Sequence, residues 1–151
     1  MQTLNVGAGR TDQEYLASEE ARRADLRADS QDDANYFFWA AGVVLLPVRL
    51  NFLVNIGTVD LLRFYGKDLG HSLPLAVLGA EALWIAILVA LGFAARSGHR
   101  WAFFAGMALY AVDMIALIVT FSMWAFGVHA FFMFRWFQGQ KALKDLSDAS
   151  A

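Results

Sequence analysis

Residues 36–137 form one long stretch that is mostly apolar and aromatic, whereas charged residues crowd into residues 1–35. A soluble chain of 151 residues could not bury so much continuous apolar length. The composition points the same way, because 58% of residues are hydrophobic and only 17% are charged, against about half and about a quarter in soluble domains. The sequence therefore predicts an all-α integral membrane protein.

Four membrane-spanning helices are expected inside this stretch. A helix needs about 20 apolar residues to cross a bilayer, and polar segments separate the first three stretches of that length. From residue 101 the apolar stretch continues with hardly a break to Phe137, which is too long for one span, so a tight turn is expected near residues 120–124, followed by a shorter fourth helix. The expected spans are residues 36–57, 73–93, 101–121 and 123–138. Residues 58–72 are of mixed polarity and are expected to form a short interfacial helix and a loop on the far side.

The segments outside the spans are expected to lie in the cytoplasm. Residues 1–35 form a tail with a charged helix at about residues 11–33, beginning at a capping box, Thr11-Asp12-Gln13-Glu14. Residues 139–151 form a polar C-terminal tail that is expected to fray after Leu146. The basic residues that flank the spans gather on one side, which predicts an N-in/C-in orientation. On the inner side are Arg10, Arg22, Arg23, Arg27, Arg96, Arg100, Arg135, Lys141 and Lys144, and on the outer side Arg63 and Lys67.

Several classes of function are disfavoured. A net charge of −2 argues against nucleic-acid binding. The absence of cysteine excludes disulfides, thiolate metal sites and thiol catalysis. No catalytic or nucleotide-binding motif stands out, so neither an enzyme nor a cofactor is expected.

One ionisable residue lies inside each expected span: Arg49, Glu81, Asp113 and His129. Counted inward from the outer ends at ~1.5 Å per residue, all four lie roughly 9–12 Å deep. A charge at mid-membrane costs at least ~2.5–3.5 kcal/mol, so these side chains should turn inward and meet. In this buried polar layer Arg49 would neutralise one carboxylate and leave the other beside His129.

Neighbouring polar groups could complete this layer. Further hydrogen bonds are expected from Asn51, Asn55 and Tyr110. The favoured interpretation is structural, since buried polar groups often fix the register of membrane helices. Two alternatives remain: a functional site for a proton, an ion or a small polar ligand, or misplaced helix boundaries. A metal site is not expected, because no paired-ligand spacing supports one.

Small residues predict close packing between helices. Four alanines recur every fourth residue along the second span, and a glycine lies in the third: Ala82, Ala86, Ala90, Ala94 and Gly106. Lipid provides no hydrophobic drive between helices, so such stripes favour close backbone contact. They are expected to face the inside of the bundle.

The second half of the chain carries motifs that resemble a known group. These are residues 92–113, with the turn Arg96-Ser97-Gly98-His99-Arg100-Trp101, then Val128-His129-Ala130-Phe131 and the later Gly139, Lys141, Ala142 and Leu143. Together they resemble an uncharacterised bacterial family of small four-helix integral membrane proteins. The resemblance implies a multi-pass protein of the bacterial inner (plasma) membrane, and it implies no particular activity, ligand or site.

The sequence thus favours a non-enzymatic accessory, structural or regulatory membrane subunit. Its partners would be the lipid bilayer and either another membrane protein or further copies of itself. The alternative is a small homo-oligomeric, proton-coupled transporter in which Glu81 and Asp113 bind the proton or the substrate. Four helices are few for a transport pathway, so that alternative requires oligomerisation.

Overall fold

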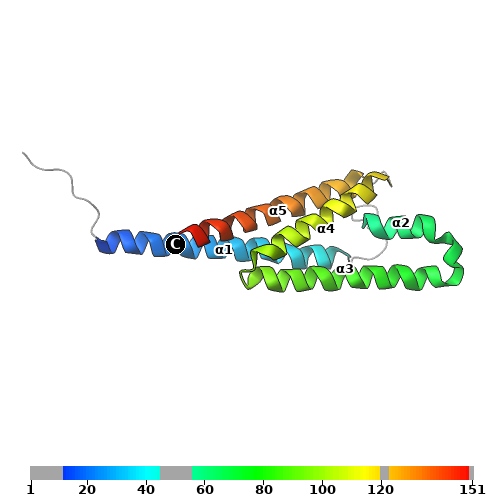
Figure 1. Cartoon of the computed structure of the whole chain (residues 1–151), viewed down its shortest axis with the longest axis horizontal. Helices are drawn as coiled ribbons and strands as arrows, with labels where there is room; N and C mark the ends of the chain where they lie inside the picture. The colour runs from blue at the N-terminus through cyan, green and yellow to red at the C-terminus, as the bar shows by residue number, and fades with distance from the viewer. Residues whose placement is uncertain (1–11, 45–55, 120–122, 150–151) are drawn as a thin grey trace, which may run out of the picture.

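The computed structural model describes residues 12–44, 56–119 and 123–149. Within these ranges every secondary-structure element is a helix, which confirms the all-α prediction, and the helices form an elongated bundle (Figure 1). The elements are α1 (Asp12–Val44), α2 (Gly57–Tyr65), the 3-10 helix η2 (Gly66–Ser72), α3 (Leu73–Arg96), α4 (Arg100–Val119) and α5 (Met123–Asp148).

Helix α1 runs without interruption through 33 residues. The sequence predicted a charged helix that ends near residue 33 and a separate span that begins at residue 36. The two are one helix, because neither Gly nor Pro lies between them to end the first. Buried positions recur along one face every three or four residues: Ser30, Asp33, Ala34, Phe37, Ala40 and Ala41. The end of the expected first span, residues 45–55, lies outside the described residues.

The remaining helices run alternately up and down the bundle. Helix α3 returns alongside α2 from the far end, a tight turn at Ser97–His99 reverses the chain into α4, and α5 runs back along α1 (Figure 1). The turn needs Gly98, whose φ of +83° lies in the left-handed region. Helix α5 continues to Asp148, past both the expected end of the fourth span and Leu146.

An aromatic core joins α1, α4 and α5. Phe37 of α1 stacks on Trp136 of α5, with ring centroids 4.1 Å apart, and Phe103 and Tyr110 of α4 pack beside them. Gly106 allows α4 to approach, because a Cβ there would lie 2.7 Å from Cζ of Phe37. The core lies about halfway along the bundle, where α1, α4 and α5 are all present.

The alanine stripe of α3 faces outward in the single chain. Ala82, Ala86 and Ala90 are exposed, and Ala94 is half-buried. Helix α3 instead buries Leu88 and the residues three, four and seven positions after it. With ~100° of rotation per residue, positions two residues from Leu88 point about 200° away from it, so the alanines lie on the opposite face. Ala82, Ala86 and Ala90 therefore do not pack inside this bundle, whereas Ala94 packs against its core.

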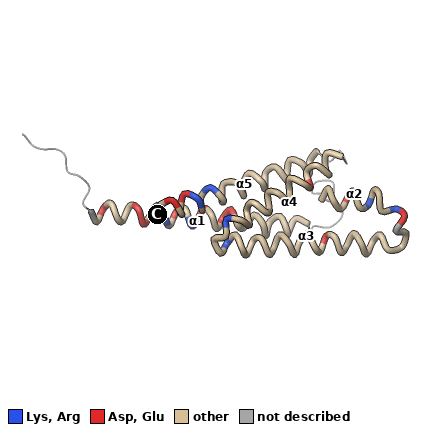
Figure 2. The backbone as a smooth tube through the Cα atoms, in the orientation of Figure 1, with Lys and Arg blue, Asp and Glu red and all other residues tan. Residues whose placement is uncertain are grey.

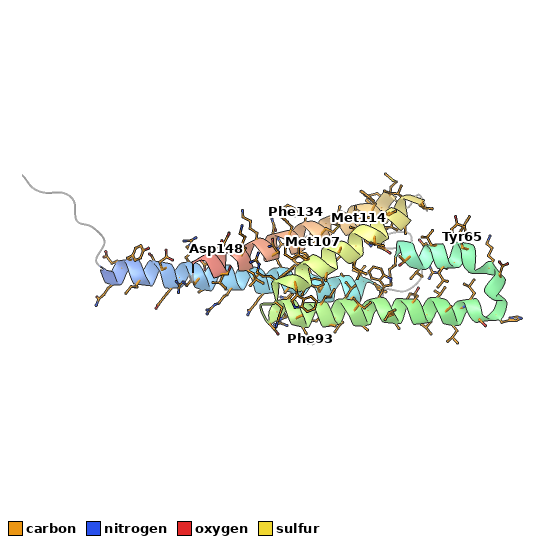
Figure 3. All side chains as sticks on the ribbon, in the orientation of Figure 1. Tyr65, Phe93, Met107, Met114, Phe134 and Asp148 are labelled. Atoms are coloured by element: carbon orange, nitrogen blue, oxygen red, sulfur yellow. The ribbon has the colours of Figure 1, made fainter. Side chains whose placement is uncertain are left out.

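Two described helices are long and apolar enough to cross a membrane: Gly70–Arg96 and Arg100–Val119. Figure 2 shows charged residues gathered toward both ends of the bundle, with a largely uncharged band between them. Large apolar side chains on α3, α4 and α5 are exposed, among them Leu83, Ile115 and Phe134. Figure 3 shows Phe134 on the outer side of α5 within this band. This distribution favours membrane association.

Candidate functional site

Asp113 of α4 and His129 of α5 meet in the interior of the bundle. Nε2 of His129 lies 2.9 Å from Oδ2 of Asp113, and the two side chains are 4% and 0% exposed. Both residues were expected in a buried polar layer at about this level. The structure brings these two together.

The Asp113 carboxylate also caps the N-terminus of α2. The backbone N–H of Gly57 donates to Oδ2 at 2.9 Å, and that of Thr58 donates to Oδ1 at 2.8 Å. The first N–H groups of a helix have no acceptor within that helix, and the side chain of Ile56, at the N-cap position, makes no capping bond. A negative charge at a helix N-terminus is favourable. Asp113 therefore does for α2 what a polar N-cap residue usually does.

A close backbone contact makes this cap possible. A Cβ on Gly57 would lie 2.6 Å from the carbonyl oxygen of Asp113 and 2.7 Å from the backbone nitrogen of Leu117. Only glycine lets the start of α2 lie directly against the backbone of α4. The contact therefore depends on the residue type at position 57.

The hydrogen-bond pattern places a proton between Asp113 and His129. Nδ1 of His129 lies 2.8 Å from the carbonyl oxygen of Ala125, which can only accept, so Nδ1 carries a hydrogen. Nε2 then either donates to the carboxylate as part of an imidazolium or accepts from a carboxylic acid. One proton lies between Nε2 and Oδ2 in both cases, and the pair has no net charge. A neutral pair avoids the cost of an isolated buried charge.

Aromatic side chains enclose the pair and link it to α3. The Tyr110 ring lies against the His129 ring, with centroids 4.3 Å apart, and Trp84 of α3 packs on the edge of Tyr110. Nε1 of Trp84 donates to Oγ1 of Thr58 at 2.9 Å. Tyr110 was expected to supply a hydrogen bond, but its contact with the pair is made through its ring. The four helices α2, α3, α4 and α5 thus converge on one polar centre.

Glu81 has a different partner. Arg63 of α2 donates to Oε1 of Glu81 at 2.7 Å and also lies 3.4 Å from Oδ1 of Asp60. The sequence had placed Arg63 in the far-side segment and had offered Arg49 as the cation for a carboxylate. Arg49, Asn51 and Asn55 lie outside the described residues.

The contributions of the α2 backbone and of Trp84 were missed at the sequence level. No signal for them was present in the sequence, because Thr58 begins the segment expected to hold the helix and is itself a common N-cap residue. In the structure the N-cap position is Ile56, whose side chain makes no capping bond. A helix start without a local cap needs an acceptor from elsewhere.

A second polar contact ties α1 to α5 near the charged end of the bundle. Nη2 of Arg135 lies 2.7 Å from Oδ1 of Asp33, and its Nη1 donates to Oε1 of Gln138 at 3.0 Å. The guanidinium also lies over the Tyr36 ring, 4.6 Å from its centroid. A groove of about 400 Å³ opens beside this contact, between α1 and α5.

Burial raises the pKa of Asp33 from 3.8 to about 6. The positive charge of Arg135 lowers this pKa, and the negative charges of Asp29 and Asp32 raise it. Because the pKa of Asp33 is higher in the folded chain, there is a window from about pH 4 to pH 6 in which Asp33 is protonated in the folded chain and ionised in the unfolded chain. Unfolding free energy should therefore fall as pH rises through that window. Asp33→Asn should flatten this part of the profile, measured by thermal unfolding in detergent. Asp25→Asn, at an exposed position, should keep the slope, and an unchanged slope in Asp33→Asn would contradict the assignment.

The polar centre holds the helices α2, α3, α4 and α5 in register. It also keeps one proton between Asp113 and His129. Among the described residues, no three His, Asp or Glu side chains are grouped so that they could hold a metal ion.

Comparisons with protein-family models, with curated proteins and with solved structures found no match to this chain.

Proposed function

We propose that this chain is a non-enzymatic integral membrane protein of the bacterial inner membrane, acting as an accessory or structural subunit. The proposal rests mainly on the hydrogen bonds of the buried polar pair, which go to other parts of the same bundle. Asp113 and His129 direct their hydrogen bonds to α2, to each other and to the backbone of α5. These are the bonds of a structural link between helices.

Access to the pair argues against a ligand site. A group that binds a substrate must contact it, yet the Asp113 side chain is 0% exposed and that of His129 is 4% exposed. The aromatic rings of Tyr110 and Trp84 cover the centre further. Glu81, the other carboxylate of the transport alternative, is already bound to Arg63. Binding a ligand here would require the helices to separate.

The proposed topology has four spans with both termini in the cytoplasm. The helices α3 and α4 are long and apolar enough to span a membrane by themselves. The apolar parts of α1 and α5 run antiparallel to each other, with α1 packed on α3 and α5 packed on α4 (Figure 1). Outward-facing Trp39 on α1 and Phe131 and Phe137 on α5 support lipid contact for these two as well. The charged ends of α1 and α5 would then extend together into the cytoplasm.

This charged extension supplies the surface for a partner. Its two helices are held together by the Asp33–Arg135 contact and, farther out, by a hydrogen bond from Arg23 to the carbonyl of Ala149. Helix α1 continues beyond the end of α5 and exposes Tyr15 and Leu16 (Figure 1). An accessory subunit needs such a projecting surface to contact another protein.

Single cysteines can test the topology, because the native chain has none. We expect Ser72→Cys to react with a membrane-impermeant maleimide in intact spheroplasts. Ser18→Cys, Ser97→Cys and Ser147→Cys should react only after lysis. All four serines are exposed, so differences in labelling report the side of the membrane. Labelling of Ser18→Cys in intact cells, or recovery of the protein in the soluble fraction, would contradict the proposal.

Proton-coupled transport is a second candidate, because the Asp113–His129 pair holds a proton. It predicts that proteoliposomes containing the protein pass protons, reported by an internal pH-sensitive dye, and that Asp113→Asn abolishes the flux. The structural proposal predicts no flux above that of empty liposomes for either protein. A flux that Asp113→Asn removes while the protein stays folded would favour transport.

A further inference from the structure

A cavity of about 600 Å³ lies at the end of the bundle opposite the charged extension of α1 and α5. It is formed by one face of α2, the start of η2 and the last residue of α4, Val119. Figure 3 places Tyr65, one of its lining residues, on α2 at this far end, away from Asp148. Val119 ends an apolar helix that can cross a membrane, so the cavity lies where the uncharged band gives way to polar residues.

The wall of this cavity is largely apolar and aromatic. Leu61, Phe64, Tyr65 and Val119 line it, and the last three are more than half exposed. Aromatic residues of this kind are enriched where a bilayer meets water. An occupant of this cavity therefore needs an apolar portion.

Within the part of the chain that the structure describes, one cation of this cavity has no carboxylate partner. Arg63 is bound by two carboxylates, those of Asp60 and Glu81. Lys67 instead holds its ammonium over the Phe64 ring, 5.4 Å from the centroid, and no ion pair to it occurs in the described ranges. An occupant with a negative group next to its apolar portion would match both parts of the cavity.

We propose that this cavity binds an anionic phospholipid of the outer leaflet, with its phosphate group at Lys67 and an acyl chain along Leu61 and Val119. The proposal rests on the membrane location proposed above. At that location the lipid is the most abundant molecule with both required features. A free phosphate would leave the apolar wall unused, and a zwitterionic headgroup would bring a second cation close to Lys67.

Native mass spectrometry of the detergent-purified chain can test this binding. Titration with phosphatidylglycerol should show one tightly retained lipid. Lys67→Gln should weaken that binding about fivefold, the usual effect of one basic residue near an anionic surface. Lys144→Gln removes one exposed cation at the opposite end of the bundle and should leave the binding unchanged. Lys67→Arg should restore most of it.

Further measurements separate the alternative occupants. Val119→Trp fills the apolar part and should also weaken phosphatidylglycerol binding, although every charge remains. Phosphatidylcholine should bind more weakly than phosphatidylglycerol, and millimolar inorganic phosphate should not displace the lipid. Equal binding of the two lipids, displacement by phosphate, or unchanged binding in Lys67→Gln would overturn the lipid site. These outcomes leave the topology untouched, whereas a soluble protein would overturn the proposed function itself.

Discussion

Asp113→Asn should lower the free energy of unfolding by about 3–5 kcal/mol, the usual cost of breaking a buried charged pair by removing one partner. An amide offers one acceptor oxygen, whereas the N–H groups of Gly57 and Thr58 now donate to separate carboxylate oxygens, one of which also shares a proton with Nε2 of His129. Its NH₂ group would have to face one of these donors. Unfolding followed by circular dichroism in mixed detergent micelles would measure the loss.

Glu81→Gln is the matched control. It makes the same change of a carboxylate to an amide, but in an ion pair in which the side chains of Glu81 and Arg63 are 30% and 35% exposed. Partly exposed pairs contribute little, so we expect a loss below about 1 kcal/mol. If Asp113→Asn costs no more than Glu81→Gln, the polar centre does not hold the helices together and the structural proposal fails.

Gly57→Ala should destabilise the protein by about 1–3 kcal/mol, the typical cost of overpacking a core. The new methyl group would lie 2.6 Å from the backbone oxygen of Asp113 and 2.7 Å from the backbone nitrogen of Leu117. Main-chain atoms within a helix cannot rotate away as a side chain can. The start of α2 must therefore move, and its hydrogen bonds to the Asp113 carboxylate must lengthen.

Gly79→Ala provides the comparison for this change. Gly79 lies in α3, and a Cβ added there would have no neighbouring atom within 4 Å, so the substitution should be neutral or stabilise by up to about 1 kcal/mol through helix propensity. The double variant Gly57→Ala/Asp113→Asn should lose less stability than the sum of the two single losses, because both break the same contact. Full additivity would show that Gly57 acts elsewhere.

Local signals were sufficient to predict the two most apolar helices. Residues 73–93 and 101–121 were expected, and the structure has Leu73–Arg96 and Arg100–Val119. Apolar length defines such a helix, Pro74 favours the first turn of the earlier one, and the basic turn at residues 95–100 interrupts the apolar stretch. Each of these signals lies within a few residues of the boundary it predicts.

The composition of the polar centre was only partly accessible. Counting depth along each span brought Asp113 and His129 to one level, and they do meet. The same count placed Glu81 with them, but depth says nothing about how a helix is rotated or what lies beside it. Helix α2 packs against α3, which brings Arg63 to Glu81 across 18 residues of sequence.

The alanine stripe shows the same limit. A spacing of four residues establishes that Ala82, Ala86 and Ala90 share a face, but it does not say which neighbour that face meets. Helix α3 packs on α1 through Gly92, where a Cβ would lie 2.9 Å from Phe38. That contact turns the alanines outward.

The cap on α2 also has a consequence for the order of biosynthesis. The N–H of Gly57 is bonded to a carboxylate that lies 56 residues later in the chain. The ribosome therefore completes α2 well before its acceptor exists, and the histidine that pairs with that acceptor follows later still. A nascent chain that ends before α4 should carry α2 without the carboxylate that caps it, so this part of the protein can reach its final arrangement only after α4 has been synthesised and has packed against α2.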